Sequence, residues 1–197
     1  MDGEELRKRL TLLPVEESAA MLLGARLVTP VGSCQIVEVE AYSGSQDPGS
    51  HAFRGETPRN RAMFGPSGHL YTYFVYGSSW MLNLTAGPAG VPAAILIRAA
   101  IPLDNLDAVR LNRPRAKSIH DLANGPGKIC AAYGIGAAEY GLDALDPDSR
   151  VHILPDKQAR EVIATPRIGL AVGKGHETPW RFVDAGAAQW ASRRSLP

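Results

Sequence analysis

The sequence predicts an α+β fold with a mostly antiparallel β-sheet. Segments in which apolar residues alternate with period two outnumber the segments of helical character. The helical segments gather at the N-terminal end and beside a basic stretch of the chain. The 197 residues contain no internal repeat or low-complexity linker, and 45 % of them are hydrophobic, which is enough for one sizeable core. We therefore expect a single domain spanning residues 1–197.

The first half of the chain provides most of the sheet. Residues 3–24 have helical character and end in a glycine stop, and the pattern changes to strands from Arg26 onward. Two alternating segments, 69–76 and 80–85, are joined through Gly-Ser-Ser and predict a β-hairpin. The continuous apolar run 92–102 is typical of a central strand that is buried on both faces. The other predicted strands of this half are residues 25–30 and 33–42.

The second half begins with helices. Residues 104–112 are predicted to be helical, and 125–135 form a helix opened by Pro126 at its first position, where a missing amide costs nothing. The C-terminal third returns to short strands, which we expect over 150–154, 165–172 and 179–184.

Composition narrows the classes of function. The formal net charge is +1, but residues 48–120 hold eight basic and three acidic residues, which is compatible with a face for an anionic partner and with an ordinary solvated surface. Two cysteines and five scattered histidines give no disulfide framework and no metal-ligand spacing, so we expect no metal and no cofactor. No segment resembles a secretory signal or approaches transmembrane length, so we expect a soluble intracellular protein without membrane contact.

The strand at 33–42 places two carboxylates in a row. Strict alternation puts Val37, Val39 and Ala41 on one face and Ile36, Glu38, Glu40 and Tyr42 on the other. A solvated face would explain a single glutamate, whereas a pair leading into a tyrosine also suits a site. Two carboxylates fit a sugar glycosidase, and one fits the activation of water when a nucleotide base is the leaving group. The local pattern leaves both open.

The predicted hairpin carries aromatic residues on both faces. Tyr71 and Tyr73 share one face with Val75, and Phe74 and Tyr76 share the other. Core packing is expected for Phe74 and one of the two tyrosines. Tyr76, beside the turn glycine, suits a wedge inserted between stacked bases.

Several polar residues stand out from their surroundings. Arg59 and Arg61 follow a threonine–proline turn and carry fork-shaped donors suited to phosphates, although a surface loop would also explain them. Arg98 ends the apolar run and needs a carboxylate or water at the edge of the core. Asn83 lies in an apolar strand, either as a satisfied core residue or as one that contacts the edge of a ligand.

The motifs taken together resemble a known family. VEVEAYSG, TPRNRAMFGPSGHLYTYFVYG, MLNLT, ILIRA, NGPGKIC, PRIG and PWRF occur in the order seen in alkyladenine DNA glycosylases, the mammalian-type 3-methyladenine DNA glycosylases. The resemblance covers about residues 5–185. It implies a curved antiparallel sheet flanked by helices, with a protruding β-hairpin. It also implies excision of 3-methyladenine, 7-methylguanine, hypoxanthine and ethenoadenine from DNA, by hydrolysis of the N-glycosidic bond without a lyase step.

The resemblance also assigns catalytic and pocket residues. Glu40 matches the general base that activates water, and Arg98 matches the residue that helps to hold that water. On this mapping Glu38 is structural or buried with a basic partner. The residues that match the base pocket are Tyr42 on one wall, His51 and Tyr73 on the opposite wall, Asn83 as the group that disfavours guanine, and Ile168 as an apolar lining residue.

The resemblance also assigns residues that contact DNA. Tyr76 matches the side chain that fills the gap left by a flipped nucleotide, and Arg59 is similar to a phosphate-contacting arginine, with Arg61 beside it. Some members carry bulky residues where this chain has Ser78 and Ser79, which predicts a slimmer wedge.

The expected partner is double-stranded DNA that contains damaged purines, bound by a monomer. The chain lacks the long N-terminal extension of animal members, which favours a bacterial protein of the cytoplasm and nucleoid; a eukaryotic member would be nuclear. Two alternatives remain open. One is a non-catalytic module that binds distorted DNA, and the other is a carbohydrate glycosidase that uses Glu38 and Glu40.

Overall fold

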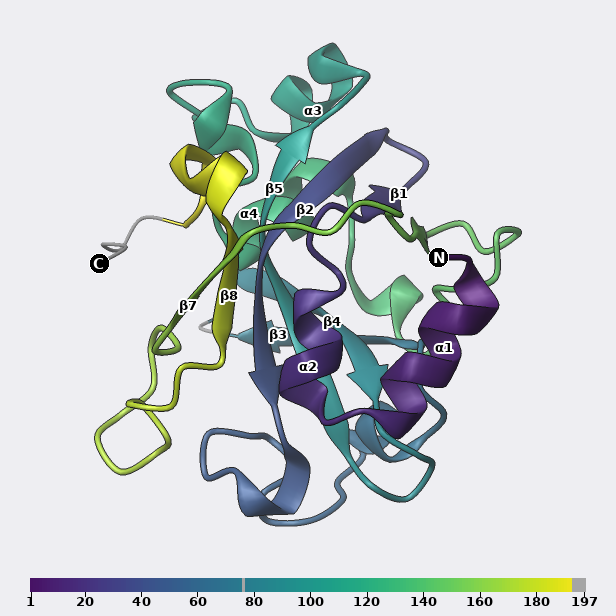
Figure 1. Ribbon diagram of the computed structural model, residues 1–197. Coiled ribbons are helices and arrows are strands. Elements are labelled where there is room, and N and C mark those ends of the chain that lie inside the picture. Colours follow the sequence, from purple (N-terminus) through teal and green to yellow (C-terminus); the bar gives the residue numbers. More distant parts are fainter. Residues whose placement is uncertain (76, 193–197) are drawn as a thin grey trace.

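An eight-stranded, wholly antiparallel sheet forms the centre of the protein (Figure 1). The computed structural model describes residues 1–75 and 77–192. The main strand order is β3-β4-β5-β2-β1-β6, and β8 pairs with β2 and carries β7. The strands are β1 (Arg26–Val28), β2 (Ser33–Tyr42), β3 (Leu70–Val75), β4 (Ser79–Ala86), β5 (Ala93–Pro102), β6 (His152–Leu154), β7 (Val162–Thr165) and β8 (Arg181–Asp184).

Four α-helices and five 3₁₀ turns accompany the sheet in the described part of the chain. Helices α1 (Gly3–Leu12) and α2 (Val15–Ala20) contact β4 and β2, and α4 (Pro126–Tyr133) contacts β4 and β5 beside α3 (Leu106–Asn112). The α+β class, the curled antiparallel sheet and the flanking helices are therefore confirmed. Within the described residues, no helix has the length and apolar character needed to cross a bilayer.

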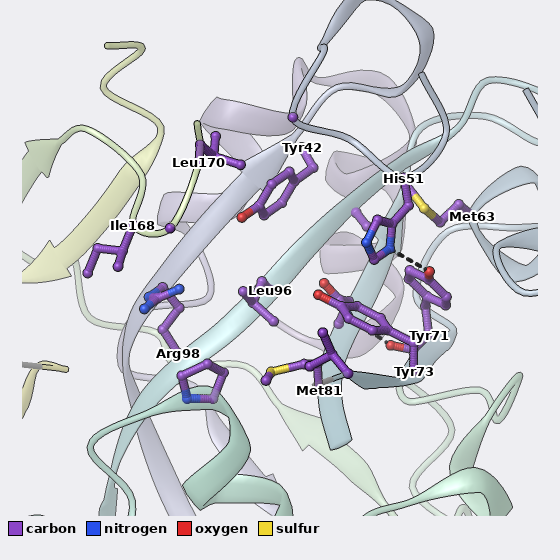
Figure 2. A pocket seen from close by; sticks show the side chains of 16 residues that line it. Tyr42, His51, Met63, Tyr71, Tyr73, Met81, Leu96, Arg98, Ile168 and Leu170 are labelled. Carbon is purple, nitrogen blue, oxygen red and sulfur yellow. Dashed lines mark hydrogen bonds between the residues drawn. The ribbon is translucent and has the colours of Figure 1, made fainter. Parts of the chain in front are cut away.

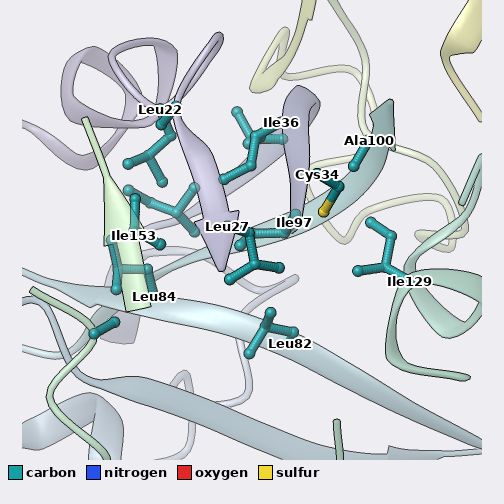
Figure 3. Packing of buried hydrophobic residues seen from close by; sticks show 14 of the residues in the cluster. Leu22, Leu27, Cys34, Ile36, Leu82, Leu84, Ile97, Ala100, Ile129 and Ile153 are labelled. Carbon is teal, nitrogen blue, oxygen red and sulfur yellow. The ribbon is translucent and has the colours of Figure 1, made fainter. Parts of the chain in front are cut away.

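The main hydrophobic core lies on one face of the curled sheet (Figure 3). It joins the N-terminal helices and α4 to the inward residues of β2, β4 and β5, among them Ile36, Leu82 and Ile97. Cys34 and Cys130 are buried in it as free thiols, and burial raises the pKa of each to about 12. The opposite face of the same strands is left for the polar residues of the site.

An irregularity where β2 and β5 pair corrects the predicted face assignment. Ile36 packs in the main core with Val39 and Ala41, whereas Val37 packs in a separate cluster with Ala99. The register between the strands is irregular between Ile36 and Val39, so the side-chain alternation changes phase there. Glu38 lies within this irregularity and Glu40 and Tyr42 follow it, and the three share one face as predicted.

The predicted hairpin is formed by β3 and β4, with Tyr73 opposite Met81 and Val75 opposite Ser79. Phe74 was expected in the core but is 45 % exposed, because it pairs with Trp80 on the outer face of the hairpin. The expectation for Tyr76 lies outside the described residues.

One predicted strand is replaced by a loop. Residues 166–173 form no strand, and β7 instead ends at Thr165. Pro166 has no amide to donate to a sheet, and the backbone amide of Ile168 is used by a side chain of β2. This loop, residues 166–175, is called the 166–175 loop below.

Candidate active site

A cavity of about 370 Å³ opens on the face of the sheet away from the main core. Its walls come from the end of β2, the inner face of the β3–β4 hairpin, β5 and the 166–175 loop. This volume is at the lower end of small-molecule sites and suits one flat heterocycle. The predicted residues that line it are Tyr42, His51, Tyr73, Asn83, Arg98 and Ile168.

Aromatic rings form two sides of the cavity. Tyr42 faces His51 and Tyr73 across the space, with Leu96 between them (Figure 2). The His51 and Tyr73 rings meet edge to face at 4.5 Å, and His51 Nδ1 lies 2.9 Å from the Tyr71 hydroxyl. Burial of the imidazole, helped by the positive charge of Arg59, lowers the pKa of His51, although part of the side chain faces solvent. The imidazole is therefore neutral at pH 7.

The Tyr42 hydroxyl points at a carboxylate behind the cavity wall. It donates a hydrogen bond of 2.8 Å to Glu40 Oε2. Burial and the negative charge of Glu40 raise the pKa of Tyr42 well above its usual value. Tyr42 therefore stays a phenol that can donate this hydrogen bond.

Glu40 is fully buried and accepts hydrogen bonds from three different elements. Besides Tyr42, Arg98 donates to Oε2 over 3.1 Å, and the backbone amide of Ile168 donates to Oε1 over 2.7 Å. All three donors belong to residues that line the cavity, whereas Glu40 itself does not line it. The carboxylate thus lies one layer behind the wall.

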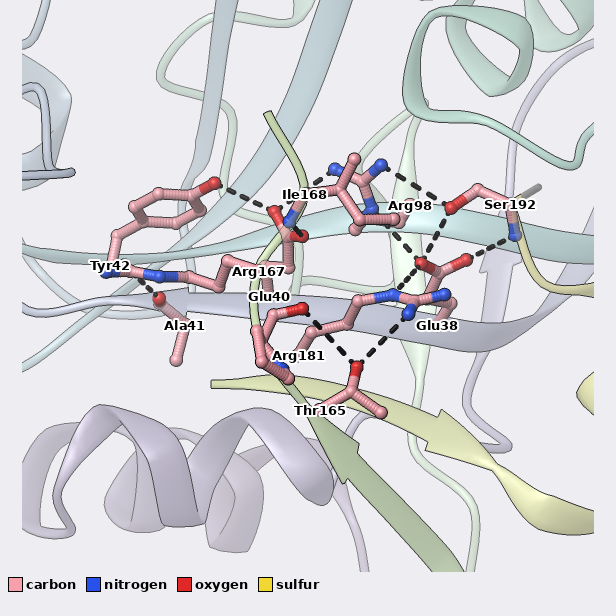
Figure 4. A network of polar contacts seen from close by, with 11 residues as sticks. Glu38, Glu40, Ala41, Tyr42, Arg98, Thr165, Arg167, Ile168, Arg181 and Ser192 are labelled. Carbon is pink, nitrogen blue, oxygen red and sulfur yellow. Dashed lines mark hydrogen bonds and ion pairs between the residues drawn. The ribbon is translucent and has the colours of Figure 1, made fainter. Parts of the chain in front are cut away.

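Glu38, two residues earlier, has a different environment (Figure 4). Its Oε1 accepts from Arg98 Nε at 3.1 Å, Arg181 Nε at 2.6 Å and the Ser192 hydroxyl at 2.7 Å, and its Oε2 accepts from the Ser192 amide at 2.5 Å. Glu38 is therefore buried with basic partners, one of the two environments expected for it. With four donors and no exposed surface, it is poorly placed to act as a second catalytic carboxylate.

Arg98 joins the two carboxylates. Burial alone would lower its pKa, but the charges of Glu40 and Glu38 outweigh burial and raise it. The guanidinium reaches the cavity wall while its Nε and Nη1 stay on the two glutamates. Arg98 and Glu40 are thus brought together as predicted from the sequence.

Asn83, Arg59 and Arg61 differ in how close they lie to the cavity. Asn83 is buried at the cavity wall, and its side-chain amide donates to the Tyr71 carbonyl over 3.0 Å. Arg59 is exposed; it donates to the Phe74 carbonyl and lies over the Tyr73 ring at 5.2 Å. Arg61 is exposed and paired with Glu56 at 3.1 Å. The two arginines flank the hairpin outside the cavity.

Sequence reasoning missed four residues that support the site. Ser192 and Arg181 complete the partners of Glu38, and Arg167 and Asp47 form a buried ion pair behind Tyr42. Arg167, between Pro166 and the apolar segment IGLAV, could have been noticed as a charge that needs a buried partner. Among the described residues, no three His, Cys, Asp or Glu side chains are grouped so that they could hold a metal ion.

Two comparisons with known proteins, one with family models and one with individual relatives, agree with each other. Residues 9–188 match the family model described as methylpurine-DNA glycosylase. A relative from Burkholderia lata is 45 % identical over 150 residues, covering 75 % of this chain and 72 % of the relative. One from Nocardia farcinica is 42 % identical over 186 residues (90 % and 87 %), and one from Methanocella arvoryzae is 41 % identical over 176 residues (87 % and 88 %). All three relatives are provisionally named 3-methyladenine DNA glycosylases.

Proposed function

Because the chain belongs to the methylpurine-DNA glycosylase family, we propose that it excises alkylated or deaminated purines from double-stranded DNA. It hydrolyses the N-glycosidic bond with a water molecule activated by Glu40 and leaves an abasic site. The observation that carries this proposal is a buried carboxylate held by three residues of an aromatic-walled cavity. The substrates considered are 3-methyladenine, 7-methylguanine, hypoxanthine and ethenoadenine.

The damaged nucleotide is first flipped out of the duplex into the cavity. Its base stacks on Tyr42 and is faced by His51 and Tyr73, since an extruded purine is held through its π-faces. Asn83 lies at the wall, where its bulk disfavours the 2-amino group of guanine. Ile168 supplies an apolar lining, which leaves a flat slot for the purine.

Glu40 then takes a proton from water. The water oxygen bonds to the sugar C1′ as the bond to the purine nitrogen breaks, and the purine leaves with that electron pair. Arg98 helps to hold the water, and the donors on Glu40 keep its carboxylate oriented. The wall residues must shift slightly to admit water to the buried carboxylate, in line with catalytic contacts that tighten only in the substrate complex.

An alkylated purine leaves more easily than a neutral one. Alkylation at N3 or N7 makes the ring cationic, so the departing base becomes neutral without further help. A neutral lesion such as hypoxanthine benefits from protonation of its ring. None of the residues that line the cavity in the described part of the chain is a lysine, so we expect no Schiff-base step.

Contacts to the DNA backbone come from beside the cavity. Arg59 and Arg61 flank the hairpin within the basic stretch 48–120 and meet phosphates. Tyr76, which precedes Gly77 in the sequence, fills the gap in the base stack. The protein acts on DNA as a monomer.

Substituting the proposed base tests the function. Glu40→Gln keeps the size of the side chain but removes its charge, so single-turnover excision from a hypoxanthine-containing duplex should fall at least ~10³-fold. The Kd for the same duplex should change less than about 3-fold, because the stacking walls remain. Excision is read as strand breaks after alkali, and the wild-type protein should give none before alkali. Glu139→Gln is the matched control, a second buried glutamate paired with an arginine, and should keep wild-type excision.

Two outcomes would contradict the proposal. Wild-type protein that binds the lesion duplex but yields no alkali-sensitive sites would be a binding module for distorted DNA. Near-normal excision by Glu40→Gln would remove Glu40 from the role of base.

A further inference from the structure

Arg167 forms a buried ion pair directly behind the cavity. Its side chain is fully buried and Asp47 is 1 % exposed, and their two parallel contacts measure 2.5 and 2.8 Å. Asp47 also accepts hydrogen bonds from the backbone amides of Ser43 and Gly49. The carboxylate is thus saturated by four donors, which compensates for burial of both charges.

The guanidinium of Arg167 also stacks between two aromatic rings. It lies 4.7 Å from the centre of the Tyr42 ring and 5.2 Å from that of Trp180. Tyr42 lines the cavity and Arg167 does not, so the cation supports the ring from behind. Such cation–π contacts are strengthened when they are desolvated, as they are here. The stacking therefore holds the plane of the ring on which a base would lie.

The same residue is connected to both oxygens of Glu40. The amide that follows Arg167, that of Ile168, donates to Oε1, and the Tyr42 hydroxyl donates to Oε2. Arg167 also donates to the carbonyl of Ala41, the residue between Glu40 and Tyr42 (Figure 4). One guanidinium therefore braces two of the three donors that orient the carboxylate.

We propose that Arg167 is a positioning residue, which orients the Glu40 carboxylate through the Tyr42 ring and the Ile168 amide. This inference rests on the proposed function, in which Glu40 is the base. A buried ion pair adds little net stability compared with apolar residues of similar volume. Its use here is geometric, since a misplacement of about 1 Å can lower a rate about 100-fold.

The structure requires an arginine for this role. The planar fork matches the Asp47 carboxylate and stacks flat on rings, whereas the ammonium of a lysine is a point charge. The remaining Nη2 contact, to the Gly175 carbonyl at 3.3 Å, joins the fork to the far end of the 166–175 loop. Arg167→Lys keeps the charge but loses the fork and the flat stacking.

The test compares Arg167→Lys and Arg167→Met with Arg7→Met. Arg7 also makes two contacts with one carboxylate, both from Nη2 to Asp143 in a partly exposed pair away from the cavity, and serves as the control. Each protein is assayed for single-turnover excision, for the Kd of lesion duplex, and for hydrogen exchange of the Ile168 amide by NMR. We expect excision to fall about 100-fold in Arg167→Met and about 10-fold in Arg167→Lys, with Kd changed less than about 3-fold. Protection of the Ile168 amide should fall at least about 10-fold in both, because the amide no longer stays on Glu40.

Arg7→Met should lose some stability and keep both the excision rate and the protection of the Ile168 amide. If Arg167→Met does not fold, Arg167→Lys alone decides the question. Two results would overturn the inference. One is wild-type protection of the Ile168 amide in the Arg167 variants. The other is a loss of excision rate that is fully explained by a smaller fraction of folded protein. A wild-type protein without excision would contradict the proposed function, whereas the exchange of the Ile168 amide would still test the positioning contacts.

Discussion

Glu38 and Glu40 occupy alternate positions on β2, and at the residue scale their surroundings separate their roles. Glu38 accepts four hydrogen bonds from two arginines and Ser192, and of these residues only Arg98 lines the cavity. Glu40 accepts three, all from residues of the cavity wall. The first arrangement holds β2, β5, β8 and the segment at Ser192 together, and the second orients a carboxylate directly behind the cavity wall.

This difference predicts unequal losses of stability from two similar substitutions. Glu38→Gln leaves the buried Arg181 without a carboxylate, so the free energy of unfolding should fall by about 3 kcal/mol. Glu40→Gln should cost less, because Arg98 keeps its contact with Glu38. Urea unfolding followed by tryptophan fluorescence measures both, and a larger loss for Glu40→Gln would reverse the assignment.

The sequence predicted the shared face of Glu38, Glu40 and Tyr42 because alternation within one strand is a local property. It did not predict that Arg98 would bridge both glutamates, since that contact depends on the register between β2 and β5. Arg167 and Asp47 were missed for a related reason. They are 120 positions apart, and their pairing is decided by how two loops pack.

At the scale of elements, the site depends on two departures from regular strands. The irregular pairing of β2 with β5 around Glu38 changes the phase of the side chains, so that Glu38 and Glu40 share the face opposite to Val39 and Ala41, which lie in the core. The 166–175 loop leaves the sheet after β7 and places the Ile168 amide on Glu40. A prediction from period-two alternation misses both the irregular pairing and the loop, because it assumes that the alternation continues along the strand.

Two glycines of the 166–175 loop test its function. Gly173 and Gly175 both have positive φ, 78° and 69°, so alanine should strain the backbone similarly at each, by about 1 kcal/mol. An added Cβ at Gly175 would lie 2.6 Å from Arg167 Nη2, whereas at Gly173 it would meet nothing within 4 Å. Gly175→Ala should therefore lower single-turnover excision about 10-fold, and Gly173→Ala should leave it unchanged. Equal excision by the two variants would show that the loop tolerates displacement of Arg167.

For the whole molecule, the class of fold and the order of most elements were predictable from the sequence, because long segments such as β2, β5 and the hairpin show a clear periodic pattern. The errors are at Phe74, Val37 and the 165–172 segment, where neighbours from distant parts of the chain decide the outcome. The grouping of the predicted pocket residues around one cavity follows from the sheet order β3-β4-β5-β2, in which only β5 separates the hairpin from β2.

The two buried thiols report on the integrity of the whole core. With a pKa of about 12 each, Cys34 and Cys130 carry almost no thiolate at pH 8, whereas an unfolded cysteine titrates near about 8.5. A thiol-specific reagent such as DTNB should leave the native protein unlabelled and should modify both cysteines once urea unfolds it. Labelling of the native protein within seconds would show that the core opens far more readily than its packing indicates.

The burial of these thiols also bears on the conditions in which a protein of this family works. Electrophiles that methylate purine nitrogens react faster with an accessible thiolate, which is the softer and stronger nucleophile. A chain with an exposed, ionised cysteine would be consumed by the same reagents that damage the DNA. Both sulfur atoms are protonated and enclosed. The protein should therefore stay unmodified at a concentration of methylating agent that modifies DNA, and it should still be active when the damage has to be repaired.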